Sequence, residues 1–152
     1  MLTNSKKRIA LLLFLALMPL TAFALDYRSV AVPKAVLYDA PSSSAKKILL
    51  LSQYYPVEVI VNLGDWLKVR DAQGSINWIE AKQLSDKRTI IVTMNNAEMR
   101  QAADSAANVV AAVEKNVVLE VLDTKPNNGW LKVKHRDGAT GYILVSATWG
   151  FN

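Results

Sequence analysis

Hydrophobic and polar residues alternate with a period of two over much of the chain after residue 25. Val57 and Val59, for example, flank Glu58. A period of two places successive side chains on opposite faces of a strand, whereas a helix repeats every 3.6 residues. The pattern therefore predicts half-buried antiparallel strands and an all-β fold. The other alternating apolar positions are Val61, Leu67, Val69, Leu119, Val121, Leu131 and Val133.

Turn residues separate these predicted strands. Residues 63–65 and 127–129 form one pair of turns, and residues 72–74 and 136–138 form the next, each with a glycine. Glycine and asparagine favour the tight turns that join antiparallel strands. The alanine-rich segment 104–113 allows a short helix. We expect a loop and then a strand, because it aligns with segment 42–51, which begins with Ser-Ser-Ser directly after Pro41.

The chain is a tandem repeat. Trp-Leu-Lys-Val occurs at residues 66–69 and again at residues 130–133. An offset of 62 residues aligns the first halves of the two copies, and an offset of 64 aligns the second halves. The two additional residues lie in the predicted turn at 125–129. Because such self-similarity sets the domain count, we expect one domain at residues 25–88 and a second at residues 89–152.

Only a short polar segment, residues 85–88, joins the two copies. The chain contains no cysteine, so no disulfide can stabilise either domain. A domain of about 60 residues buries only about 60% of its unfolded surface and is marginally stable alone. We therefore expect the two copies to pack against each other in a fixed orientation.

Residues 1–24 have the features of a secretory signal. Lys6, Lys7 and Arg8 precede an apolar run, and small residues occupy positions 22 and 24. The alternative is a membrane anchor, but Pro19 interrupts a run that is shorter than the about 20 residues needed to cross a bilayer. We expect cleavage after Ala24, a periplasmic mature protein and no stable membrane insertion.

The net charge of +5 is largely due to this signal. Of 18 basic residues, three precede the apolar run, which leaves 15 against 13 acidic residues. Basic and acidic side chains are nearly balanced in both halves of the mature chain. Nucleic-acid binding requires a concentration of positive charge that neither half has. Nucleic acid is therefore not an expected partner.

Several segments, in this order and spacing, resemble a bacterial SH3-like (SH3b) domain. In the first copy they are Leu-Tyr-Asp-Ala-Pro-Ser at 37–42, Val-Glu-Val at 57–59, Gly-Asp-Trp-Leu-Lys-Val-Arg-Asp at 64–71, Gly74 and Trp-Ile at 78–79. The second copy matches at 99–102, 129–133, 137–138, 141–143 and 149–150. The whole resembles the exported tandem SH3-like proteins of Gram-negative bacteria. The resemblance implies two five-stranded β-barrels that bind cell-wall peptide or an envelope protein rather than catalyse.

The residue types needed for catalysis are scarce. Nucleophilic catalysis uses a cysteine, or a hydroxyl with a base beside it. The chain has no cysteine and one histidine, His135, which lies next to a turn among basic residues. We expect His135 to be a solvated turn residue, the alternative being contact with an anionic ligand. No catalytic, metal or cofactor site is expected.

Aromatic residues are the candidates for ligand contact, because they offer rigid contact area at small entropic cost. The first copy is richer in them, and the five candidates are Tyr38, Tyr54, Tyr55, Trp66 and Trp78. The resemblance implies that Tyr38, Trp66 and Trp78 face a common groove. The family pattern is incomplete, because Ala40 replaces its next aromatic.

Alternative roles remain open for the tryptophans. Trp66 and Trp130 can instead close the ends of their own domains, and Trp78 and Tyr142 can pack in the core or at its rim. Trp149 is expected to seal the second domain or the contact between domains.

These patterns favour a monomeric binding or scaffold protein with ligand contacts mainly in the first copy. The second hypothesis is a structural component that stabilises a larger envelope assembly.

Overall fold

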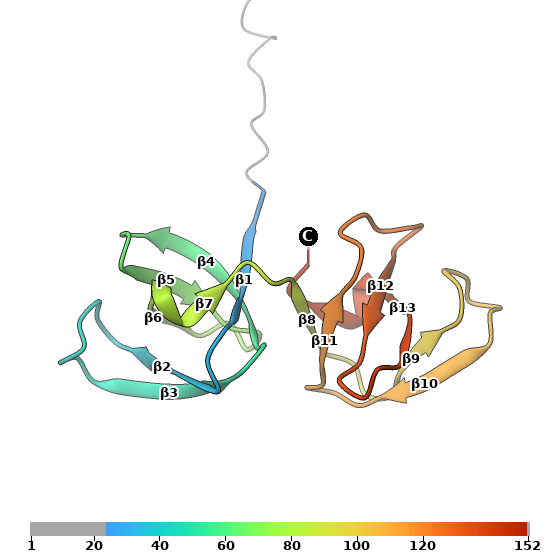
Figure 1. Ribbon diagram of the computed structural model, residues 1–152, viewed down its shortest axis with the longest axis horizontal. Coiled ribbons are helices and arrows are strands. Elements are labelled where there is room, and N and C mark those ends of the chain that lie inside the picture. The colour runs from blue at the N-terminus through green and yellow to red at the C-terminus, as the bar shows by residue number, and fades with distance from the viewer. Residues whose placement is uncertain (1–23, 152) are drawn as a thin grey trace, which may run out of the picture.

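The computed structural model describes residues 24–151 as two seven-stranded antiparallel sheets that lie side by side (Figure 1). Within this range the helical elements are two 3-10 turns, η1 (Ala81–Gln83) and η2 (Val145–Ala147). The predicted all-β fold is confirmed. The predicted signal peptide lies outside the described residues, except for Ala24.

The first sheet has the strand order β3-β2-β6-β5-β4-β1-β7. Its strands are β1 (Asp26–Val30), β2 (Lys34–Tyr38), β3 (Lys47–Ser52), β4 (Pro56–Asn62), β5 (Trp66–Arg70), β6 (Ile76–Glu80) and β7 (Leu84–Ser85). The second sheet repeats this order as β10-β9-β13-β12-β11-β8-β14. Its strands are β8 (Thr89–Val92), β9 (Ala97–Arg100), β10 (Val109–Val113), β11 (Val118–Val121), β12 (Trp130–Lys134), β13 (Thr140–Leu144) and β14 (Thr148–Trp149).

The expected five-stranded closed barrel is wrong in strand count and in closure. Each sheet has seven strands, and its order ends at two edges, β3 and β7 in the first domain. Strand β7 is two residues long, so it is too short to show alternation in the sequence. Strand β1 carries a buried serine, Ser29, whose hydroxyl lies 3.3 Å from that of Ser85 in β7. Because this buried residue is polar, the alternation of apolar and polar residues does not mark β1 in the sequence.

Each domain has its own apolar core at equivalent repeat positions. The first core includes Leu37, Leu67, Val69 and Ile79, and the second includes Met99, Leu131, Val133 and Ile143. All eight side chains are at most 1% exposed. The alternation in the Trp-Leu-Lys-Val segments therefore places leucine and valine inside in both copies, as predicted.

One predicted inward position is wrong. Val61 is 38% exposed because β4 contains a bulge: Val59 pairs with Val69, but Val61 pairs with Lys68. The additional residue, Ile60, shifts the register by one and moves the following side chains to the other face. In the second copy, by contrast, segment 104–113 is a loop followed by β10, as predicted.

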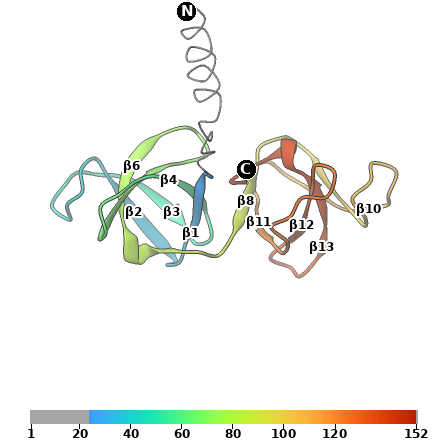
Figure 2. The same ribbon diagram turned by 90° about the horizontal axis from the view of Figure 1, so that it is seen from above.

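The two domains lie side by side in Figure 2, and a seam of aromatic and polar contacts joins them. The rings of Tyr27 in β1 and Trp149 in β14 meet edge to face, with centroids 5.4 Å apart. The Arg88 guanidinium lies 5.8 Å from the Tyr27 ring and 5.5 Å from the Phe151 ring. The Thr89 hydroxyl donates a 2.7 Å hydrogen bond to the Tyr54 carbonyl. Trp149 thus lies at the seam, one of its two predicted positions.

Tyr55 ties two loops of the first domain together. Its hydroxyl donates to the side-chain oxygen of Gln73 at 2.9 Å and accepts from the Ala72 amide at 3.3 Å. Burial is the main reason that the pKa of the Tyr55 phenol is raised. Burial, followed by the charge of Glu58, likewise raises the pKa of Tyr27.

We predict that Trp149→Ala loosens the seam. The variant loses the Tyr27 contact and part of the buried apolar area, a cost of about 2 kcal/mol. Small-angle scattering should show a larger radius of gyration, and thermal unfolding a lower midpoint. Trp78→Ala, which changes an aromatic residue away from the seam, is the control. An unchanged scattering profile for Trp149→Ala would show that this contact does not hold the domains.

We also predict that stability falls at alkaline pH and that Tyr55→Phe reduces this fall. Above pH about 10 the unfolded chain loses phenolic protons that the folded chain retains, so unfolding becomes easier as pH rises through the raised folded pKa. At neutral pH the variant should be less stable by about 1 kcal/mol, because it loses the hydroxyl's hydrogen bonds. Urea unfolding at neutral and alkaline pH measures both effects. Equal alkaline losses in the two proteins would contradict the prediction.

Candidate functional site

The structure brings together three of the five candidate residues on the outer face of the first sheet. Tyr38, Trp66 and Trp78 each neighbour a core residue in β2, β5 or β6, so their side chains lie on the face opposite the core. Tyr38 pairs with Trp78 in the ladder, and its ring meets that of Trp66 edge to face at 5.4 Å. Tyr38 is only 6% exposed, whereas both tryptophans are half-buried. The tryptophans therefore offer contact area and Tyr38 supports them.

Charged residues border this aromatic face. The Lys68 ammonium lies 5.6 Å from the centre of the Trp78 ring. Lys82 forms a 2.6 Å ion pair with Glu80, and the hydrogen bond to that carboxylate raises the pKa of Lys82. The face therefore combines aromatic surface with both signs of charge.

Gln83 holds the end of this face in place. Its side-chain oxygen accepts a 3.1 Å hydrogen bond from the Val36 amide, and its nitrogen donates to Glu80 at 3.2 Å. These bonds connect η1 to β2 and β6. The backbone amide of Val36 thereby has a partner at the point where β2 and β6 separate.

The equivalent face of the second domain is built differently. Arg100 occupies the position of Tyr38, where it donates to the Ala107 carbonyl at 2.7 Å and pairs with Glu98. Trp130 is 7% exposed, so this tryptophan is a packing residue as the alternative interpretation held. Ala147 replaces Gln83, and a cavity of about 230 Å³ lies beside it and Trp130.

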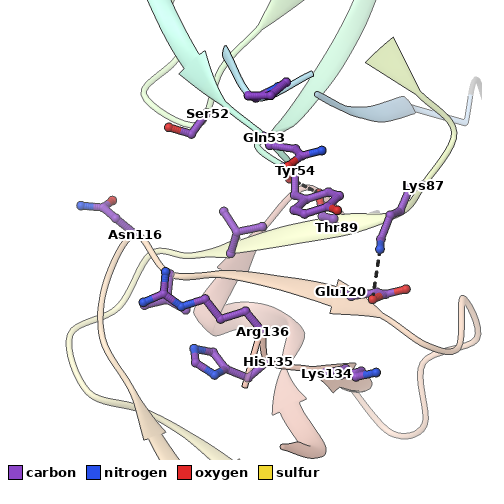
Figure 3. Close-up of a pocket in the computed structure, with 13 residues that line it drawn as sticks. Ser52, Gln53, Tyr54, Lys87, Thr89, Asn116, Glu120, Lys134, His135 and Arg136 are labelled. Carbon is purple, nitrogen blue, oxygen red and sulfur yellow. Dashed lines mark hydrogen bonds and ion pairs between the residues drawn. The ribbon is translucent and has the colours of Figure 1, made fainter. Parts of the chain in front are cut away.

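Tyr54 lies apart from the aromatic face, in a cleft between the two domains (Figure 3). The cleft has a volume of about 770 Å³. Tyr54 is 44% exposed, and the Lys87 ammonium lies 4.7 Å from its ring centre. Lys87 also forms a 3.2 Å ion pair with Glu120, so the linker and the second domain meet above this ring.

The opposite wall of the cleft carries the basic residues of the second domain. Lys134, His135 and Arg136 line it, as Figure 3 shows. His135 Nδ1 lies 2.9 Å from the Asp137 carboxylate, whose pKa is lowered mainly by the hydrogen bond that it accepts from the Ala139 amide and also by His135. His135 is half-buried rather than fully solvated, so its predicted environment is wrong in part.

The five candidates thus divide among three places. Tyr38, Trp66 and Trp78 share one face, Tyr54 lines the cleft, and Tyr55 is half-buried with its hydroxyl engaged in the loop contacts described above. Of the other cleft residues, sequence reasoning considered only His135 for ligand contact, as the alternative to a solvated turn residue. The basic run around His135 was a signal, but only the orientation of the domains places it opposite Tyr54.

Two general features of the described residues bear on the class of site. Across residues 24–151, no group of three or more histidine, cysteine, aspartate or glutamate side chains is arranged to hold a metal ion. In the same range no helix is both long and apolar enough to span a membrane.

Comparisons with solved structures give distant similarities. Two are NlpC proteins of Trichomonas vaginalis: NlpC2 has a TM-score of 0.38 and 18% identity, with 85% of this chain and 49% of that chain covered. NlpC1 has a TM-score of 0.38 and 18% identity, with 84% and 46% covered. An NlpC/P60 family protein of Bacillus cereus has a TM-score of 0.37 and 16% identity, with 81% and 55% covered. The chain spans about half the length of these proteins.

No curated protein sequence matches the chain. The family model of the bacterial SH3 domain, however, matches residues 31–86 and residues 93–150. The two matches cover most of the described sequence, one within each sheet, and agree with the tandem repeat. The chain therefore belongs to the bacterial SH3 domain family, of which it contains two tandem copies.

Proposed function

We propose that this protein is an exported, non-catalytic binding or scaffold protein of the periplasm, whose first domain recognises cell-wall peptide or an envelope protein. Bacterial SH3 domains commonly bind cell-wall peptidoglycan. The observation that supports the proposal best is the aromatic face, where Trp66 and Trp78 are partly exposed and Tyr38 supports Trp66.

The chemistry of this face suits a peptide. Half-buried tryptophans bind the apolar parts of a ligand with little loss of side-chain entropy. Lys68 beside Trp78 and the Glu80–Lys82 pair can complement polar groups of either sign. The second domain has Arg100, tied to Glu98, at the position of Tyr38, and its Trp130 is buried. Ligand binding is therefore assigned to the first domain.

Non-catalytic action is supported by the residue types present. The chain has no cysteine, and its single histidine lies at a turn in contact with Asp137. Neither arrangement supplies the nucleophile and base that acyl transfer uses. We propose export from the features of residues 1–24.

A specific observation favours the second candidate, a structural role in an envelope assembly. The edge strands β3 and β10 lie at opposite ends of the molecule in Figure 1 and expose apolar side chains. Ile48, Leu49 and Leu50 of β3 are 44–55% exposed, and Val109 and Val110 of β10 are 45–48% exposed. Exposed apolar edge strands are templates for pairing with another chain.

We predict that Trp78→Ala weakens binding to purified sacculi or to an envelope partner at least about tenfold, because it removes a central aromatic contact. Tyr142→Ala is the matched control, since Tyr142 pairs with Lys132 as Trp78 pairs with Lys68. The affinity of Tyr142→Ala should stay within about twofold of that of the unchanged protein. Co-sedimentation measures both, after circular dichroism has shown intact folds. Equal losses in the two variants would place the ligand elsewhere.

The assembly role makes a different prediction. Combined Leu50→Lys and Val110→Lys changes should abolish co-purification with membrane-associated envelope proteins, because charged edges disfavour strand pairing. Trp78→Ala should leave co-purification unchanged. Co-purification that survives the edge changes would exclude the assembly role.

A further inference from the structure

The interdomain cleft is built from the same loop in both repeat copies. Tyr54 and Asn116 are separated by the repeat offset of 62 residues, and both line the cleft. Both have a left-handed backbone, with φ of 68° and 70°. The two domains therefore face each other across equivalent loops, and the cleft exists only when both copies are present.

Tyrosine, which is present at position 54, is an unusual residue for a left-handed backbone conformation. The other non-glycine residues with positive φ in residues 24–151 are Asn96, Asn116 and Asn128. Asparagine tolerates the left-handed region, whereas a bulky side chain there is strained. Strained residues of this kind are concentrated at ligand sites. The first copy thus holds an exposed aromatic ring in the cleft, where asparagine would fit the backbone better.

The basic wall of the cleft is specific to the second copy. At the equivalent positions, with an offset of 64, the first copy has Arg70, Asp71 and Ala72 in place of Lys134, His135 and Arg136. In the first copy the charges are satisfied internally. Arg70 forms a 3.5 Å ion pair with Glu58, and the Asp71 carboxylate accepts from the Gln73 and Ser75 amides at 2.9 Å.

In the second copy two of the three corresponding residues, Lys134 and Arg136, have no acidic partner within residues 24–151. Glu120, the acidic residue lining the cleft, is paired with Lys87, and His135 is paired with Asp137. Lys134 and Arg136 are exposed. Two cations therefore remain available for an anion, and a cleft between two domains concentrates their field.

We propose that the interdomain cleft binds the carboxylate of a short peptide. The Arg136 guanidinium holds the carboxylate, for which its planar fork is suited, and Lys134, which points away from Arg136 in Figure 3, adds to the positive potential of the cleft. Tyr54, on the opposite wall, contacts the peptide's apolar atoms, together with Val117 and Val118. A volume of about 770 Å³ is within the range of sites for small ligands. The site is separate from the aromatic face of the first domain and does not depend on that proposal.

A peptide carboxylate suits the cleft better than phosphate on a lipid headgroup. The Arg136 guanidinium matches one carboxylate, and the Glu120 carboxylate nearby disfavours a second negative charge. The apolar atoms of Pro33, Val117 and Val118 give a peptide chain contacts that inorganic phosphate cannot make.

The test is a nuclear magnetic resonance titration of the mature protein, residues 25–152, with acetyl-Ala-Ala-Ala that has a free carboxylate. The expected result is a saturable shift of the Tyr54, Asn116 and Arg136 amides. The same peptide with a C-terminal amide should bind with at least about tenfold lower affinity, as measured from the shifts of these amides. No shift of these amides by the free acid would overturn the proposal. An equal effect of the two peptides, or stronger binding of inorganic phosphate, would also overturn it.

Variants distinguish binding from folding. The double variant Lys134→Gln, Arg136→Gln should bind the peptide with the free carboxylate about tenfold more weakly. Lys132→Gln is the control, because Lys132 is an exposed lysine of the same strand outside the cleft, and its affinity should not change. Tyr54→Asn should raise the thermal midpoint of unfolding, because asparagine relieves the strain of the left-handed backbone. The same variant should still bind the peptide more weakly. A Tyr54→Asn variant that is less stable and binds normally would show that Tyr54 only supports the fold.

Discussion

The hydrogen bond from Thr89 to the Tyr54 carbonyl and the contact of Tyr27 with Trp149 hold the two domains of this protein together. Each domain has its own core, and neither has a disulfide. Tyr27 is buried where it meets Trp149, and the linker residue Lys87 lies against Glu120. The cleft and its charge depend on this contact, because its walls come from different domains.

The two copies retain equivalent core packing and differ at several positions around it. Leucine, valine and isoleucine occupy equivalent core positions, since any loss of volume there would leave a cavity. Around the shared packing, Tyr38 corresponds to Arg100, Gln83 to Ala147 and Asp71 to His135. Tyr38 and Asp71 are nearly buried, and Ala147 belongs to the second core. The duplication therefore preserved the fold while individual contacts in the two domains diverged.

The candidate site shows the limits of residue type as a guide. Tyr38, Trp66 and Trp78 could be grouped through the resemblance to SH3-like domains, and strand pairing in the structure brings them to one face. Tyr54 and Tyr55 are neighbours in the chain, yet one ring lies in the cleft and the other joins two loops. The left-handed backbone of Tyr54 separates their directions. A local conformation of this kind leaves no signal in hydrophobic patterning.

By itself, the sequence determined the all-β class, the two copies and the inward positions of most strands, because alternation and repetition are local properties of the chain. It did not show the short strands β1 and β7, the bulge at Ile60 or the open edges of each sheet. These depend on partners that are distant in sequence. Only the tertiary structure decided how the domains meet. That orientation rests on a few contacts between Tyr27, Thr89 and Trp149 and their partners, and these contacts follow no period along the chain.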